Sequence, residues 1–518
     1  MSHWIILPIV LPALLAPFIL MVIRHHLDLQ RIFSVAGTVA LLGIATGLLA
    51  HAATGDITVY ELGDWPAPFG IVLVLDRLSG LMVFLTAVLA LAVLLYAIWT
   101  GWDDRGRHFH ALFQFQLMGV LGAFLTGDAF NLFVFFEVLL IASYGLMIHS
   151  GGAHRLHAGV QYVAYNLIGS TLFLFALGTI YAVTGTLNMA DLAVKVAEMP
   201  AEDTALIRVA AVLLLLVFSV KAAVLPLHFW LPGSYGNAPG PVAALFAIMT
   251  KVGVYSVLRM YTLVFGPQVE ATQGLASNWL IYAALLTVAA GTIGVLGSRR
   301  MMRMAAFGTI GSTGTLMVAV SLFTQDTAAA AIYYMIHSTF AAGLMFLVAD
   351  LVVERQGDSI RPYQPMPHGG TISVLFFAAA IAVAGMPPLS GFVGKLLVLD
   401  AARDSAQAVL VWSVILITSF CAILGFARAG SLVFWKSHDD NEPDSEEIAD
   451  AEVPPDPRAV KLPVAPPRLP FVPAFALLGV LVLLTVFAGP VMTYTGKTAE
   501  QLYNPQTYID TVLKGTGS

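Results

Sequence analysis

The fold of this chain is constrained above all by a succession of long apolar segments that covers nearly its whole length. A helix needs about 20 apolar residues to cross the hydrocarbon core of a bilayer. Fourteen segments come close to this length, at approximately 4–23, 32–52, 71–99, 111–127, 129–148, 158–183, 206–231, 239–265, 278–297, 302–323, 328–353, 371–400, 406–435 and 469–491. Backbone groups in lipid must form their hydrogen bonds within the protein, so each segment is expected to be helical. The sequence therefore predicts an all-α polytopic membrane protein with 14 transmembrane helices.

The composition is typical of a membrane protein and argues against a nucleic-acid partner. Only 11% of the 518 residues are charged, whereas soluble globular proteins carry about 25%. The formal charge of −6 arises largely from an acidic stretch near residues 439–456, and the rest of the chain is close to neutral. We therefore expect no nucleic-acid partner. Cys421 is the single cysteine, which excludes a disulfide or a cysteine metal site within the chain.

The first apolar segment is expected to be a retained helix and not a cleaved signal peptide. The run from Ile5 to Ile23 has no basic residue before it, and its cationic cluster begins after it at Arg24. A signal peptide would carry its positive charge in front of the apolar run. This order places the N-terminus outside the cell.

Loop charges test the helix count and set the orientation. The loops after odd-numbered helices carry fifteen basic residues, namely Arg24, Arg31, Arg105, Arg107, Arg155, Arg299, Arg300, Arg303, Arg355, Arg361, Arg428, Lys436, Arg458, Lys461 and Arg468. The loops after even-numbered helices carry four, namely Arg77, Lys195, Arg208 and Arg403. Cytoplasmic loops are enriched in Lys and Arg, so the odd-to-even loops are predicted to be cytoplasmic and both termini external.

Four ionisable residues lie inside the apolar segments, namely Glu137, Lys221, Lys251 and Lys395. Each costs roughly 2.5–3.5 kcal/mol near the middle of a span, and such residues usually serve ion or proton movement. Two structural alternatives remain. A lysine can extend along its helix to the interface, and Glu137 could form an ion pair that only joins two helices. Arg259, two turns beyond Lys251, is expected to reach the outer interface.

Two of the predicted spans are interrupted by prolines. The seventh contains KAAVLPLHFWLP, with Pro226 in its centre, and the twelfth contains GMPPLSGFVGK, with Pro387 and Pro388. Interrupted helices in corresponding positions point to an ion site between two structural repeats. The breaks lie five helices apart, which predicts five-helix repeats. The expected organisation is a three-helix segment at 1–110, repeats of helices 4–8 and 9–13 at 111–265 and 278–435, an acidic Pro-rich cytoplasmic loop at 436–468, and a last helix with an outer tail at 469–518.

Several histidines accompany these features. His228 follows Lys221 by seven residues, so both would lie on one face of a continuous helix. His337 lies in the eleventh span with Tyr333 one turn before it; it could relay a proton or be a satisfied core residue. Seven further histidines lie in loops or at helix ends and are expected to be surface residues, namely those at 25, 26, 108, 110, 149, 154 and 157.

No cofactor chemistry is expected. The chain has no phosphate-binding glycine motif, so it is not expected to bind ATP. It also has no Cys or His cluster with the spacing of a metal or iron–sulfur site.

The motifs together resemble the antiporter-like membrane subunits shared by respiratory complex I and the Mrp-type cation/proton antiporters. The resemblance rests on FFEVLLIASYG, KAAVLPLHFWLP, APGPVAALFAIMTKVGVYSVLR and GMPPLSGFVGK, and covers about residues 70–435. Within the family, LPGSYGNAPGPVAAL and the lysine at 395 are most similar to the D-type branch of the Mrp Na⁺/H⁺ antiporter subunits. The resemblance implies fourteen helices with two inverted five-helix repeats, in a multi-pass protein of the bacterial inner membrane.

The resemblance also implies roles for single residues. Glu137 and Lys221 would form an ion-pair module, Lys251 would be the central lysine, His337 the bridging histidine and Lys395 the terminal lysine. The expected function is proton translocation in a hetero-oligomeric complex, coupled to export of Na⁺ or another monovalent cation. The alternatives are a proton-pumping subunit of a respiratory NADH:quinone oxidoreductase and a scaffold whose buried charges only join subunits.

Overall fold

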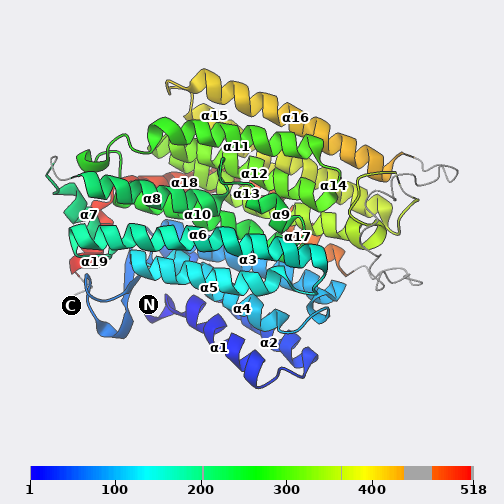
Figure 1. Cartoon of the computed structure of the whole chain (residues 1–518), viewed down its shortest axis with the longest axis horizontal. Coiled ribbons are helices and arrows are strands. Elements are labelled where there is room, and N and C mark those ends of the chain that lie inside the picture. Colours follow the sequence, from blue (N-terminus) through cyan, green and yellow to red (C-terminus); the bar gives the residue numbers. More distant parts are fainter. Residues whose placement is uncertain (1, 201–203, 363, 437–468, 515–518) are drawn as a thin grey trace.

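The computed structural model describes residues 2–200, 204–362, 364–436 and 469–514. Its long helices lie side by side along the longest axis of the molecule (Figure 1). These helices are α1 (Leu7–Met21), α2 (Leu27–Ala52), α3 (Arg77–Thr100), α4 (Phe109–Leu125), α5 (Ala129–Met147), α6 (Ala153–Thr184), α8 (Ala205–Ala222), α10 (Gly240–Leu263), α11 (Ser277–Gly297), α12 (Met301–Ser321), α13 (Gln325–Gln356), α14 (Gly369–Ala384), α16 (Ala408–Phe434) and α17 (Phe471–Val486).

The polytopic helical fold is confirmed. Within the described ranges, ten helices are long and apolar enough to cross a membrane, and the bent pair α17–α18 would be an eleventh. Three shorter apolar helices, α1, α4 and α14, coincide with further predicted spans. The count of fourteen spans and the two repeats stay predictions. The predicted cytoplasmic loop at 436–468 lies, apart from Lys436, outside the described residues.

The centre of the bundle is formed by α10 and α13. Every residue of α10 is buried. α13 packs against α10 and also contacts α12, α14 and α17. The pair α1–α2 lies at one edge of the molecule and α16 at the opposite edge (Figure 1). Outward faces carry large exposed apolar side chains, such as Phe175 on α6 and Phe420 on α16. Such faces suit lipid, because acyl chains are as apolar as these side chains.

Both predicted breaks are present, and their backbone groups find partners. The first lies between α8 and α9 (Trp230–Tyr235), and the second lies between α14 and α15 (Ser390–Ala401). At the first break, Trp230 Nε1 donates to the Val220 carbonyl at 3.0 Å, and the Leu225 N–H donates to Thr287 Oγ1 at 2.8 Å. The prediction that His228 shares a helical face with Lys221 is wrong, because the chain leaves the helix after Ala222.

One end of the bundle carries short elements that the apolar pattern did not predict. They are the hairpin of β1 (Thr58–Glu61) and β2 (Val72–Leu75), and the helices α7 (Met189–Ala197), α18 (Ala488–Tyr503) and α19 (Gln506–Lys514). Both termini lie toward this end (Figure 1). The last predicted span is not one straight helix: the chain bends by 80° between α17 and α18. α18 then packs against α13 and α10, and α19 packs against α7.

Arg259 does not reach the interface, so that expectation is wrong. Its guanidinium lies 2.6 Å from the carboxylate of Asp76, and the two side chains are only 5% and 2% exposed. Asp76 also caps α3 by accepting from the Ser79 N–H at 2.8 Å. The ring of Tyr508 on α19 lies 5.3 Å from the guanidinium carbon. The buried ion pair therefore connects α3 to α10, and the contact with Tyr508 connects α19 to both.

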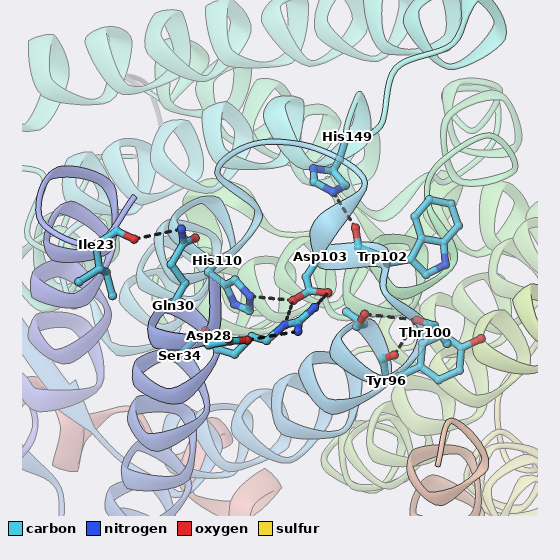
Figure 2. A network of polar contacts seen from close by, with 12 residues as sticks. Ile23, Asp28, Gln30, Ser34, Tyr96, Thr100, Trp102, Asp103, His110 and His149 are labelled. Carbon is cyan, nitrogen blue, oxygen red and sulfur yellow. Dashed lines mark hydrogen bonds and ion pairs between the residues drawn. The ribbon is translucent and has the colours of Figure 1, made fainter. Parts of the chain in front are cut away.

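His110 and His149 are buried, so the expectation of surface histidines is wrong for these two. His110 Nε2 lies 3.2 Å from Asp103 Oδ2, and Arg31 donates to the same carboxylate at 2.6 and 3.0 Å (Figure 2). Although burial alone would raise it, these two partners hold the pKa of Asp103 below its usual value. His149 Nε2 contacts the Trp102 carbonyl at 2.8 Å (Figure 2).

We expect Asp76→Asn to destabilise the protein strongly. It leaves the Arg259 guanidinium buried without a counter-charge, and breaking a buried pair costs about 3–5 kcal/mol. The measurement is thermal unfolding of the purified protein in detergent. The control is Asp400→Asn, because Asp400 pairs with Arg403 at 3.2 Å but the two side chains are 64% and 66% exposed. Equal unfolding temperatures for the two variants would show that the buried pair contributes no more than a surface one.

Candidate functional site

The first part of the site lies on α5 and α6. Glu137 of α5 is half-buried, and its carboxylate accepts a hydrogen bond from the Ser170 hydroxyl of α6. Glu137 acts electrostatically on Lys221, but the two side chains form no direct ion pair. The sequence drew attention to Glu137 because an acid in an aromatic helix is rare; Ser170 carried no such signal.

Lys221 lies in the last turn of α8, next to the first break. Its side chain is buried, and Nζ has no hydrogen-bond partner. The ring centroid of Phe136 lies 5.9 Å from Nζ, within the range of a cation–π contact. Because the helix ends here, its partly negative C-terminus lies inside the bundle, where it favours a cation.

Lys251 lies near the middle of α10 and is fully buried. Its Nζ also has no hydrogen-bond partner. The backbones of α10 and α8 approach closely at Gly253, where an added Cβ would lie 2.7 Å from the Ala222 nitrogen. This close contact lies two residues from Lys251 and one from Lys221, so the helices that carry the two lysines touch at the level of the site.

His337 joins the central helices to the second break. It is fully buried on α13, and its Nδ1 lies 2.9 Å from the Ser390 hydroxyl at the start of α15. Both Lys251 and Lys395 act electrostatically on the imidazole. Nε2 has no well-formed hydrogen bond and lies beside the backbone of Gly391, whose added Cβ would be 3.0 Å away.

Lys395 does not extend toward the surface. Its Nζ donates to the Ala384 carbonyl and to Ser419 Oγ, both at 2.8 Å. Lys395 therefore satisfies a carbonyl that the second break leaves free at the end of α14. The side chain also borders a small cavity, whose hydroxyl-bearing lining residues are Thr292, Ser312, Thr315, Tyr334 and Thr418.

The residues expected to support the ionisable groups lie at the two breaks and on α13. Pro226 and His228 lie in the first break, and Pro387 and Pro388 lie in the second. Tyr333 does not support His337 in the way expected: its hydroxyl donates to the Leu484 carbonyl of α17 at 3.0 Å. The ring beside His337 is that of Tyr334, at 5.5 Å between centroids. A spacing of one turn favoured Tyr333, but the residue three positions before His337 is the one that reaches it.

The arrangement is a set of ionisable groups on α5, α8, α10, α13 and α15, with both broken helices included. Electrostatic interactions link Glu137 to Lys221, and link His337 to Lys251 and Lys395. Such a set can exchange protons and pass a charge effect from one group to the next. In the part of the chain that the structure describes, no group of three or more His, Cys, Asp or Glu side chains is arranged to hold a metal ion.

Comparison with known sequences gives one family. The family model described as "NADH:quinone oxidoreductase/Mrp antiporter, TM" matches residues 126–422. The probable D subunit of the K(+)/H(+) antiporter of Rhizobium meliloti is 39% identical, over 99% of this chain and 98% of that protein. The D subunit of the Na(+)/H(+) antiporter of Bacillus subtilis is 38% identical, over 99% of this chain and 100% of that protein.

Solved structures share the fold. A chain in the Mrp complex from Dietzia sp. DQ12-45-1b superposes with a TM-score of 0.85 at 27% identity, covering 99% of this chain and 100% of that one. A chain in respiratory complex I from Thermus thermophilus superposes with a TM-score of 0.76 at 22% identity, covering 97% of this chain and 99% of that one. The second likeness shows the fold alone.

We expect Gly391→Ala to destabilise the protein. A Cβ at this position would lie 2.1 Å from the Ala382 carbonyl oxygen as well as close to His337, so the start of α15 must shift. Overpacking of this kind costs about 1–3 kcal/mol. The measurement is thermal unfolding, with Gly370→Ala as the control, because an added Cβ there meets nothing within 4 Å. An unchanged unfolding temperature for Gly391→Ala would contradict the close packing at the site.

Proposed function

Because the chain belongs to the family of membrane subunits shared by NADH:quinone oxidoreductases and Mrp antiporters, we propose that it is the proton-translocating subunit of a multisubunit monovalent cation/proton antiporter. It is a transporter subunit and not a classical enzyme. The observation that carries the proposal is the pair of lysines, Lys221 and Lys251, buried in a lipid-embedded bundle without hydrogen-bond partners. Residues of this kind are expensive and are retained for ion or proton movement.

The first half of the proposed route begins at Glu137. When this carboxylate takes up a proton, the negative charge near Lys221 disappears, and the ammonium loses its main electrostatic support. Loss of this charge favours release of the Lys221 proton toward Lys251. The helices that carry the two lysines are in contact at Gly253. Ser170 holds the Glu137 carboxylate in place by donating a hydrogen bond to it.

The second half runs from Lys251 through His337 to Lys395. The charges of Lys251 and Lys395 both act on His337, so a proton on either lysine disfavours a proton on the imidazole. A histidine exchanges protons near neutral pH, which makes it a suitable relay. Ser390 fixes the orientation of the ring through Nδ1. The hydroxyl-lined cavity beside Lys395 offers a polar exit for the proton.

The driving force comes from the membrane. Movement of one elementary charge across the bilayer is worth about 2.3 kcal/mol per 100 mV. We place the Arg-rich connections of the odd-to-even loops in the cytoplasm and both termini outside, in the inner membrane of a bacterial cell. The proton would then travel inward while a cation is exported by the complex, in which this chain assembles with other subunits.

The rival functions have less support. The two relatives that match over nearly the whole chain at 39% and 38% identity are named as antiporter subunits. The likeness to respiratory complex I, at 22% identity, concerns the fold. The relatives' names mention K⁺ in one case and Na⁺ in the other, so the exported cation is proposed only as monovalent.

We expect substitution of the five ionisable groups of the proposed route to abolish exchange. The variants are Glu137→Gln, Lys221→Ala, Lys251→Ala, His337→Ala and Lys395→Ala, each in the assembled complex in inside-out vesicles. The measurement is collapse of a pH gradient on addition of Na⁺ or K⁺. Each variant should lose most of the wild-type rate, because removal of one group interrupts the proton route.

The control for this experiment is Arg403→Ala, which removes an exposed charge at a loop. It should retain the wild-type rate. Wild-type exchange in all five assembled variants would remove the proposed route and would favour the scaffold. Proton pumping that needs a quinone and no added Na⁺ or K⁺ would favour the oxidoreductase.

We also expect Ser419→Ala to slow exchange several-fold without abolishing it. The change removes one of the two hydrogen bonds of the Lys395 ammonium and leaves the bond to the Ala384 carbonyl. The measurement is the initial rate in the same vesicles. Ser413→Ala on the same helix is the matched control, because Ser413 is exposed. Equal rates for the two variants would show that Ser419 does not position Lys395.

A further inference from the structure

A cleft of about 470 Å³ lies away from the proton route, where α1 ends, α2 begins and α3 is followed by α4. Its charged and titratable lining residues are Arg24, His25, Asp103, Asp104, Arg107 and His108. None of these residues takes part in the proposed transport. The cleft lies at the ends of helices, which is the level at which lipid headgroups meet a membrane protein.

The charges of the lining that form no ion pair are net positive. Asp103 is one of the lining residues, but Arg31 and His110 already contact its carboxylate (Figure 2). Arg24 donates only to the neighbouring imidazole of His25, at 2.9 Å. Arg24 and Arg107 are exposed and form no ion pair with any described residue. Asp104 offsets one of these two charges, so the two guanidinium groups leave the cleft with one net positive charge.

The walls of the cleft are fixed before any ligand arrives. Gln30 Nε2 donates to the carbonyls of Ile23 and Arg24, at 3.2 and 3.0 Å, and so holds the turn between α1 and α2. Next to Asp103, which lines the cleft, His149 Nε2 lies 2.8 Å from the Trp102 carbonyl and so holds the start of the segment between α3 and α4 (Figure 2). A preformed site loses less free energy on binding than a mobile one.

The cleft adjoins an apolar surface. Met21 and Val22 at the end of α1 are 76% and 64% exposed, and Ile32 in the second turn of α2 is 61% exposed. These side chains lie on membrane helices within a few residues of Arg24 and Leu27, which line the cleft. A ligand with a charged head and apolar tails would satisfy both surfaces, whereas a free inorganic anion would satisfy only the cleft.

We propose that this cleft binds the phosphate-bearing headgroup of an anionic phospholipid, with the acyl chains along α1 and α2. Arg24 and Arg107 donate to the phosphate oxygens, an interaction for which the planar guanidinium is well suited. Basic pockets between transmembrane helices are a known physical solution for binding such headgroups. The proposal does not depend on the transport function.

The test uses the purified, delipidated complex that contains this chain, titrated with phosphatidylglycerol and followed by native mass spectrometry. The cleft variant is Arg24→Gln with Arg107→Gln. The matched control is Arg299→Gln with Lys436→Gln, which removes the same charge from two exposed residues outside the cleft. The wild type and the control should bind one phosphatidylglycerol about 30-fold more tightly than the cleft variant, which corresponds to about 1 kcal/mol for each arginine.

Two further arms identify the ligand. Phosphatidylcholine, which has no net charge, should bind the wild type and the cleft variant equally and weakly. Inorganic phosphate at millimolar concentration should not displace phosphatidylglycerol. Equal affinity of wild type and cleft variant for phosphatidylglycerol would overturn the proposal, as would preference for phosphatidylcholine. Displacement by inorganic phosphate would assign the cleft to a free anion instead.

Discussion

Two helix breaks inside a membrane-embedded bundle determine most of what this protein can do. In lipid, a free carbonyl or N–H costs several kcal/mol, so each break must be supplied with donors and acceptors from side chains. At the second break one of those donors is Lys395 itself, which binds the Ala384 carbonyl. At the first break the donors and acceptors are Trp230 and Thr287, and Lys221 is left without a partner. The breaks therefore bring both polar backbone and titratable side chains to the interior.

The two breaks use their lysines differently, although both contain prolines. Lys221 lies before its break, in the last turn of α8, and Lys395 lies after its break, in the second turn of α15. Lys221 is sensitive to the charge on Glu137, whereas Lys395 is held by a carbonyl and a hydroxyl. The difference agrees with the proposed roles of a group that responds to an incoming proton and a group that delivers one.

The sequence predicts the apolar helices well, because the length and apolarity of a segment decide whether it can cross a membrane. It also reveals the unusual charges, because an ionisable residue stands out in an apolar segment. It failed where a partner comes from a distant part of the chain. The sequence around Arg259 indicates an interfacial residue, because nothing near it in the chain points to Asp76, which pairs with it. His110 differs, because its partner Asp103 lies only seven residues earlier and the apolar pattern does not show the turn that brings the two together. Helical spacing also failed at His228, because it assumes a helix that the prolines interrupt.

The bend after α17 has a consequence for how the molecule is made. It turns α18 back across α13 and α10, so that Tyr494 binds the Arg77 carbonyl at 2.7 Å and Tyr508 lies over Arg259. The Asp76–Arg259 pair can form once α10 has left the ribosome, but its aromatic cover belongs to helices that are synthesised more than 200 residues later. During biogenesis, the pair is therefore without this cover until α18 and α19 have been synthesised and have folded against α10 and α7.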